Sequence, residues 1–227
     1  MISLLKSTFN TRYLKTSCAK SFLIRSDKID DCSEDDIEFL LSVGIKNVID
    51  LRDLSNKKTN PNLSKYGIKL LNSPMNVSKL RKEFLKKFPN GNCFDYYVFL
   101  LTQYNRIRDF FEKLVLTEGG VLFCCSAGRD RTGIIAFLIE LISGTDKKDI
   151  VEDMAVSDLN LAKINNVTNM QLASNLNYDK AKTRALKLYN WFFESYSSVG
   201  EYLEKIGFDS NGISDIKIRI NELLSNN

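Results

Sequence analysis

Short apolar runs and amphipathic stretches alternate along the first two thirds of the chain. The runs typical of buried strands lie at residues 21–25, 45–52, 66–75 and 120–123. The patterns typical of helices lie at residues 33–44, 78–88, 96–116 and 134–144. Because strands that alternate with helices usually form a parallel sheet, this pattern predicts an α/β fold with a central, mainly parallel sheet flanked by helices.

The last third of the chain has only helical patterns. They lie at residues 149–159, 179–196, 199–206 and 213–224. The polar segment 53–65, which contains Pro61, is predicted to be a loop. No linker rich in Pro, Gly or Ser divides the chain and no internal repeat occurs, so we expect one domain over residues 1–227.

The junction after the strand at 120–123 carries the most chemistry. It has the sequence Cys-Cys-Ser-Ala-Gly-Arg-Asp-Arg-Thr-Gly at residues 124–133, and an apolar helix follows it. A strand-to-helix turn directs backbone N–H groups and the positive end of a helix dipole at one point, which favours an anion. Cys125 opens this turn and Arg131 closes it, with five residues between them. Ligands of parallel sheets bind at such carboxyl ends of strands.

These residue types suit the transfer of a phosphoryl group. The backbone N–H groups of residues 126–131 (Ser126, Ala127, Gly128, Arg129, Asp130 and Arg131) are the candidate phosphate cradle, and the Arg131 fork can hold two oxygens. The same positive environment favours the thiolate of Cys125, whose in-line attack would give a phosphocysteine that water hydrolyses. Thr132 could donate its hydroxyl to the Cys125 sulfur and ease the departure of the thiolate.

Such a reaction needs an acid for the leaving oxygen and a base for the water. Asp130 is the nearest carboxylate in the sequence, and Asp95 is a rival. Each also has a structural explanation: Asp130 as a residue favoured by the helix dipole, and Asp95 as the N-cap of the following helix. Asp50 and Arg52 are expected to form an ion pair at a strand end that braces the loop.

Two other segments have alternative interpretations. A nucleotide-binding loop of the Walker type is excluded, because Gly133 is followed by two isoleucines instead of Lys and Ser or Thr. The basic amphipathic segment 78–88 is best explained as a surface helix with one packed face. A mobile lid over an anionic site, or a contact with a membrane surface, is the alternative.

Composition restricts the function further. The chain of 227 residues has no histidine, which excludes histidine-based catalysis and histidine metal sites, and no Cys-x-x-Cys pair. We therefore expect no metal and no other cofactor. The net charge of +4 identifies no partner, and no nucleic acid is expected. Five cysteines without disulfide spacing, Lys6 within the N-terminal apolar run and the lack of a membrane-spanning stretch predict a cytoplasmic protein without stable membrane insertion.

The loop at residues 125–133 resembles the signature loop of protein tyrosine phosphatases. It is most similar to that of the bacterial tyrosine/serine protein phosphatases, which has the pattern His-Cys-x-Ala-Gly-Lys-Asp-Arg-Thr-Gly. The segments 10–14, 23–27, 44–52 and 196–206 also resemble elements of this family. The resemblance implies the phosphatase fold, with Cys125 as nucleophile, Arg131 as phosphate clamp and Asp130 as general acid. It agrees with the absence of a Trp-Pro-Asp lid, since Trp191 is followed by Phe192.

Three residues depart from the family pattern. Cys124 stands where the family has a histidine that buttresses the loop, and a thiol is a poorer hydrogen-bond donor. Arg129 replaces a lysine and keeps its charge, and Asn56 stands where a glutamate usually follows the strand at 44–52.

The predicted function is therefore a phosphatase that hydrolyses phosphate monoesters through a phosphocysteine. Phosphotyrosine is the expected substrate, with phosphoserine and phosphothreonine as further ones, so a phosphorylated protein is the expected partner. A phosphoinositide is the alternative substrate, because Arg129 beside Arg131 would suit a polyanionic head group. A non-catalytic phosphate-binding pseudophosphatase is the competing class.

Overall fold

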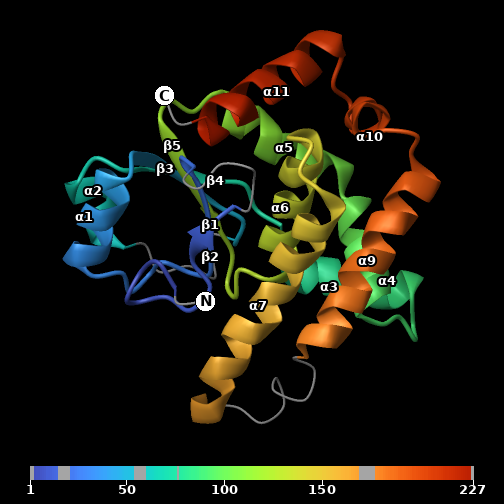
Figure 1. Ribbon diagram of the computed structural model, residues 1–227, viewed down its shortest axis with the longest axis horizontal. Coiled ribbons are helices and arrows are strands. Elements are labelled where there is room, and N and C mark those ends of the chain that lie inside the picture. Colours follow the sequence, from blue (N-terminus) through green and yellow to red (C-terminus); the bar gives the residue numbers. More distant parts are fainter. Residues whose placement is uncertain (1–2, 15–20, 54–59, 76, 169–176, 226–227) are drawn as a thin grey trace.

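One five-stranded sheet forms the centre of the molecule (Figure 1). The computed structural model describes residues 3–14, 21–53, 60–75, 77–168 and 177–225. The strands are β1 (Arg12–Tyr13), β2 (Leu23–Ser26), β3 (Ile45–Asp50), β4 (Lys69–Asn72) and β5 (Gly120–Cys124). Their order is β1-β2-β5-β3-β4, with β2, β5, β3 and β4 parallel and β1 antiparallel to β2. The predicted α/β fold with a mainly parallel sheet is confirmed.

Helices cover both faces of this sheet (Figure 1). The helices α1 (Glu34–Ser42) and α2 (Pro61–Lys65) lie on one face, and α5 (Tyr104–Val115) and α6 (Asp130–Ile142) lie on the other. The remaining helices pack around α5 and α6: α3 (Val77–Lys87), α4 (Cys93–Leu101), α7 (Lys147–Thr168), α9 (Tyr178–Ser195), α10 (Val199–Lys205) and α11 (Ser210–Leu224). The predicted helical C-terminal part is therefore also observed.

The central strand β5 is buried along its whole length and divides the core in two. Val121 and Phe123 face the larger apolar cluster, under α4, α5 and α6, whereas Leu122 and Cys124 face the smaller one, under α1 and α2. This alternation is the period of two that a strand imposes on its side chains. Cys125 belongs to the larger cluster, so the two adjacent thiols lie on opposite sides of the sheet.

The segment 53–65, predicted to be a loop, contains helix α2. Its N-cap is Asn60, whose side chain accepts a hydrogen bond from the backbone N–H of Asn62, and Pro61 occupies the first turn. Proline favours the start of a helix because its missing N–H would lack a partner there in any case. The prediction of a loop was therefore wrong for residues 61–65. Asn56 lies outside the described residues.

The segment 96–116, predicted to be one helix, forms two. Helix α4 ends at Leu101 with Thr102 as its C-cap, and Gln103, with φ −82° and ψ 55°, leaves the helical region before α5 begins. The carbonyl of Leu101 at this end accepts a hydrogen bond from the Tyr202 hydroxyl at 2.8 Å. Apolar residues continue on both sides of the break, so the pattern alone did not reveal it.

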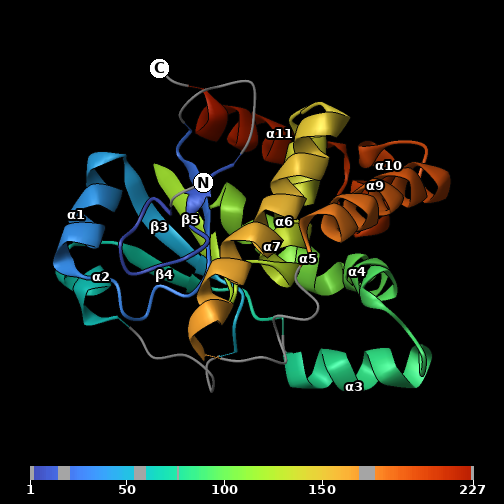
Figure 2. The same cartoon turned by 60° about the horizontal axis from the view of Figure 1, so that its bottom comes forward.

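Helix α3 lies at the margin of the molecule beside α4 (Figure 2). It packs through Phe84, whose ring centroid is 5.2 Å from that of Tyr96 and 5.7 Å from that of Phe99. This agrees with a surface helix that has one packed face. No helix in the described parts of the chain is both long and apolar enough to cross a membrane.

The carboxyl ends of three strands meet at one edge of the sheet. Cys124 pairs in register with Ser26 of β2 on one side and with Asp50 of β3 on the other. The turn after β5 therefore emerges between the ends of β2 and β3, at the position where parallel sheets usually bind ligands.

Candidate active site

The turn at residues 125–129 joins β5 directly to α6 and holds Cys125 almost out of contact with solvent. The strand ends at Cys124, Arg129 is the N-cap of α6, and Asp130 and Arg131 form its first turn. Cys125 is 3% exposed. The sequence-predicted residues 125–131 thus lie together at one helix N-terminus.

The carbonyl groups of this turn are held from outside. The Asn10 amide donates from Nδ2 to the carbonyls of Ala127 and Gly128, at 3.0 Å each, and Arg25 donates from Nη2 to that of Gly128 at 2.9 Å. The backbone N–H of Lys28 lies 3.4 Å from the carbonyl oxygen of Ser126. Since C=O and N–H point in opposite directions across a planar peptide, these contacts turn the following N–H groups toward the inside of the loop. Among the described residues, none accepts a hydrogen bond from those inward N–H groups.

Gly128 allows the turn to lie against β2. Its φ is +63°, and a Cβ atom built there would be 2.6 Å from the backbone nitrogen of Asp27 and 2.7 Å from the carbonyl oxygen of Ser26. Both the left-handed backbone and the close approach require glycine. The close packing of the turn against β2 therefore requires glycine at position 128.

The Arg131 side chain is fixed across the loop. Its Nη1 donates to the carbonyls of Leu51 and Met75 at 3.1 and 3.2 Å, and its Nη2 donates to Oγ of Ser126 at 3.1 Å. The two carbonyls follow β3 and β4, so the guanidinium is anchored to the end of the sheet. A preorganised guanidinium loses little further freedom when it binds an oxyanion.

Asp130 lies beside Tyr97 of α4. The Tyr97 hydroxyl and Nε of Arg129 both donate to Oδ1 of Asp130, at 3.0 Å each. The rival acid, Asp95, occupies the third position of α4, where its carboxylate accepts a hydrogen bond from the backbone N–H of Asn92 at 2.8 Å. The prediction of Asp95 as the N-cap of α4 was wrong: Asn92 is the N-cap, and Asp95 is its capping-box partner.

Cys124 and Thr132 stand directly before and after the segment from Cys125 to Arg131. Thr132 is fully buried, and its hydroxyl has no hydrogen-bond partner among the described residues, so its contact with the Cys125 sulfur stays a prediction. Burial raises the pKa of Cys124 well above its usual value, and the carboxylate of Asp50 adds to the shift. Cys124 is therefore a neutral thiol. Its backbone carbonyl accepts from the N–H of Leu51 at 2.8 Å.

The predicted ion pair between Asp50 and Arg52 is present. Arg52 donates from Nη2 to Oδ2 of Asp50 at 2.9 Å. The other side of the fork reaches Asp30, at 2.8 Å from Nη1 and 2.6 Å from Nη2. The ends of β2 and β3 are thereby connected below the loop.

A second, buried ion cluster was not anticipated from the sequence. Asp153 of α7 accepts hydrogen bonds from Nε of Arg12, at 2.7 Å, and from Arg25. Burial opposes the ionised form of Asp153, but the two guanidinium groups outweigh it and keep its pKa below the usual range. The sequence feature that could have indicated this buried ion cluster is the series of carboxylates among the apolar residues 150–159. No group of three or more Cys, Asp or Glu side chains in the described parts of the chain is arranged to hold a metal ion.

The chain is similar to known tyrosine phosphatases. The chain is 28% identical over 148 residues to a tyrosine-protein phosphatase of Nostoc commune, and the match covers 63% of this chain and 50% of the relative. The chain thus spans about half the length of that curated relative. The tyrosine phosphatase family matches residues 8–222, which include the loop, every strand and almost every helix. The chain belongs to the tyrosine phosphatase family.

Proposed function

We propose that the chain is a cysteine-dependent phosphatase that hydrolyses phosphate monoesters through a phosphocysteine intermediate. Phosphotyrosine in proteins is its proposed main substrate, with phosphoserine and phosphothreonine as further ones. The observation that carries the proposal is the outward orientation of the loop carbonyls, which directs N–H groups inward beside Cys125 and Arg131. Family membership supports the same activity.

In the proposed first step, the loop N–H groups and Arg131 bind the three non-bridging oxygens of the phosphate. The Cys125 thiolate attacks phosphorus, an S–P bond forms, and the P–O bond to the leaving group breaks. Asp130 gives its proton to the leaving oxygen. In the second step Asp130 takes a proton from water, the water oxygen bonds to phosphorus, and the S–P bond breaks. A hydrogen bond donated by the Thr132 hydroxyl would stabilise the departing thiolate.

A phosphoprotein suits the site better than a phosphoinositide. The argument for a polyanionic head group used Arg129 as an additional cation. Its Nε is occupied by Asp130, and its Nη1 lies 3.7 Å from Asp158. The Arg129 side chain is only 17% exposed and faces two carboxylates, so its charge is already compensated and attracts a second phosphate only weakly. A panel of phosphopeptides and phosphoinositides at equal concentration tests the substrate class, and faster release of phosphate from the lipids would contradict it.

The mechanism is tested with p-nitrophenyl phosphate and Cys125→Ser. Wild type should hydrolyse the substrate, and rapid acid quench should trap a phosphorylated protein whose phosphoryl group maps to the peptide that contains Cys125. Cys125→Ser should lose essentially all activity and trap no phosphorylated protein. Cys93→Ser is the matched control, because Cys93 is an exposed free thiol at the start of α4. Equal rates for wild type and Cys125→Ser would exclude the covalent mechanism.

A further inference from the structure

The two oxygens of the Asp130 carboxyl group have different surroundings. Oδ1 accepts hydrogen bonds from the Tyr97 hydroxyl and from Nε of Arg129, at 3.0 Å each. Oδ2 accepts none from any described residue. Tyr97 is only 4% exposed, and burial raises the pKa of its phenol far above the usual value, so it stays protonated and remains a donor. In a carboxylic acid, an oxygen that accepts two hydrogen bonds is the carbonyl oxygen, and the other carries the proton.

The donors to Oδ1 are themselves held by a closed ring of contacts. Nη1 of Arg129 lies 3.7 Å from Oδ1 of Asp158, and Oδ2 of Asp158 accepts from Nη2 of Arg184 at 3.2 Å. The guanidinium of Arg184 lies over the ring of Tyr97, 5.3 Å from its centroid. The ring therefore runs from Asp130 through Arg129, Asp158, Arg184 and Tyr97 back to Asp130.

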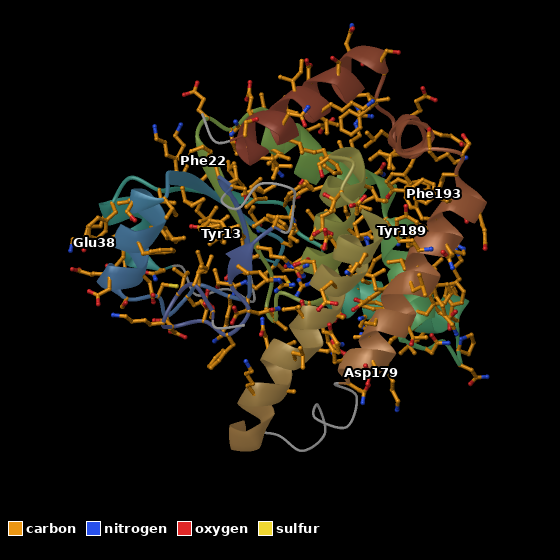
Figure 3. All side chains as sticks on the ribbon, viewed as in Figure 1. Tyr13, Phe22, Glu38, Asp179, Tyr189 and Phe193 are labelled. Atoms are coloured by element: carbon orange, nitrogen blue, oxygen red, sulfur yellow. The ribbon has the colours of Figure 1, made fainter. Side chains whose placement is uncertain are left out.

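This ring draws on four helices. Asp158 belongs to α7 and is 1% exposed, Tyr97 belongs to α4, and Arg129 caps α6. Arg184 lies on α9 between Asp179 and Tyr189, which are both labelled in Figure 3. The helices α7 and α9 pack along one another (Figure 1). When all four charged groups are ionised the ring is neutral, so the fully buried carboxylate of Asp158 has cations on both sides.

Arginine at position 129 is required for both carboxylate contacts. Its Nε faces Asp130 while its Nη1 faces Asp158, so one planar group bridges the two. A lysine has a single nitrogen and lacks this fork. The arginine that departs from the family pattern thus connects the carboxylate of Asp130 to that of Asp158 on α7.

We infer that Tyr97 and Arg129, supported by Asp158 and Arg184, are positioning residues that reserve Oδ2 of Asp130 for the transferred proton. This inference rests on the proposed function. As the S–P bond forms and the P–O bond breaks, the proton leaves Oδ2 for the leaving-group oxygen. In hydrolysis of the phosphocysteine, Oδ2 takes a proton from the attacking water. Oδ1 keeps its two donors throughout.

The test measures kcat/KM of Tyr97→Phe across aryl phosphates with leaving groups of different basicity. For phenyl phosphate, which needs the acid, we expect a loss of about tenfold, the effect of one hydrogen bond. The leaving group of 2,4-dinitrophenyl phosphate departs without a proton from the acid, so for this substrate we expect kcat/KM to change by less than about twofold. Tyr104→Phe is the matched control, since its hydroxyl contacts Tyr196 at 3.0 Å and not the loop. It should equal wild type with both substrates.

Arg129→Lys and Asp130→Asn complete the series. Arg129→Lys keeps the charge but loses the bridge, so it should show the same dependence on the leaving group as Tyr97→Phe. Thermal unfolding of each variant separates this effect from loss of folded protein. If Asp130→Asn shows the dependence but Tyr97→Phe and Arg129→Lys behave like Tyr104→Phe, the ring is only structural and the inference is wrong, while the proposed function stands. If Asp130→Asn shows no dependence, the acid assignment and the inference are both wrong.

Discussion

The guanidinium of Arg25 lies completely buried under the loop and donates a hydrogen bond to the carbonyl oxygen of Gly128 at 2.9 Å. The same side chain forms an ion pair with Asp153. One residue of β2 thus connects the backbone of the proposed phosphate cradle to α7. The shape of the loop therefore depends on the buried charge cluster as well as on its own sequence.

Replacing Arg25 by methionine should destabilise the protein strongly. The change leaves Asp153 with Arg12 alone and leaves the Gly128 carbonyl with the Asn10 amide alone. Removal of one partner from a buried ion pair costs about 3 kcal/mol. Urea unfolding should show a lower midpoint with an unchanged m-value. Arg25→Lys, which keeps a charge at this position, should lose less, and equal stability of Arg25→Met and wild type would contradict the role of this contact.

Gly128→Ala should abolish activity while Gly144→Ala does not. Both glycines have positive φ, +63° and +72°, but only at Gly128 would the added Cβ meet backbone atoms within 3 Å. The shared cost of the left-handed backbone is about 1 kcal/mol. Comparing the two variants in p-nitrophenyl phosphate hydrolysis separates the effect of crowding from that of φ. Similar activity of the two would show that the turn can move away from β2.

Arg131→Lys should lower kcat/KM by about 10²–10³-fold, the usual loss when an oxyanion donor is removed. A lysine nitrogen cannot contact the Leu51 and Met75 carbonyls and Ser126 with the fixed geometry of the guanidinium. Inhibition by inorganic phosphate should weaken in parallel, because the same group binds the ground-state anion. A change in kcat/KM without any change in phosphate inhibition would place Arg131 outside the phosphate contacts.

Stability should decrease with rising pH above about 8.5 because of two buried thiols. Burial raises the pKa of Cys124 well above its usual value and that of Cys32 to about 12, with nearby carboxylates adding to the shift of each. Below the pKa of an unfolded thiol, about 8.5, both states hold the proton and the full stability is present. Above it, the unfolded chain releases the proton and the folded protein does not. Each thiol should therefore cost about 1 kcal/mol of unfolding free energy between pH 8 and 9.5.

Urea unfolding at these two pH values measures this loss. Cys32→Ala should reduce the decrease between pH 8 and 9.5, whatever its effect on stability at pH 8. Cys93→Ser is the control, because it removes an exposed thiol and leaves both buried thiols in place. The same decrease in Cys32→Ala and wild type would contradict the assignment.

The sequence alone determined the elements that depend on neighbours in the chain. The five-residue spacing of Cys125 and Arg131, the apolar strand before them and the apolar helix after them predicted the turn, because a strand end and a helix start are local features. The alternation of strands and helices likewise predicted the parallel sheet, and parallel pairing brings the carboxyl ends of β2, β5 and β3 to one edge.

Only the tertiary structure decided which distant side chains complete the site. Asn10 and Arg25 hold carbonyls more than a hundred positions away, and Tyr97 reaches Asp130 from another helix. Helix ends such as those of α2 and α4 also depended on capping contacts that the apolar pattern does not contain. A buried polar group needs a partner, but hydrophobic periodicity carries no information about which one. Asp158 and Arg184 meet because α7 packs against α9, and no local motif in the sequence indicates that packing.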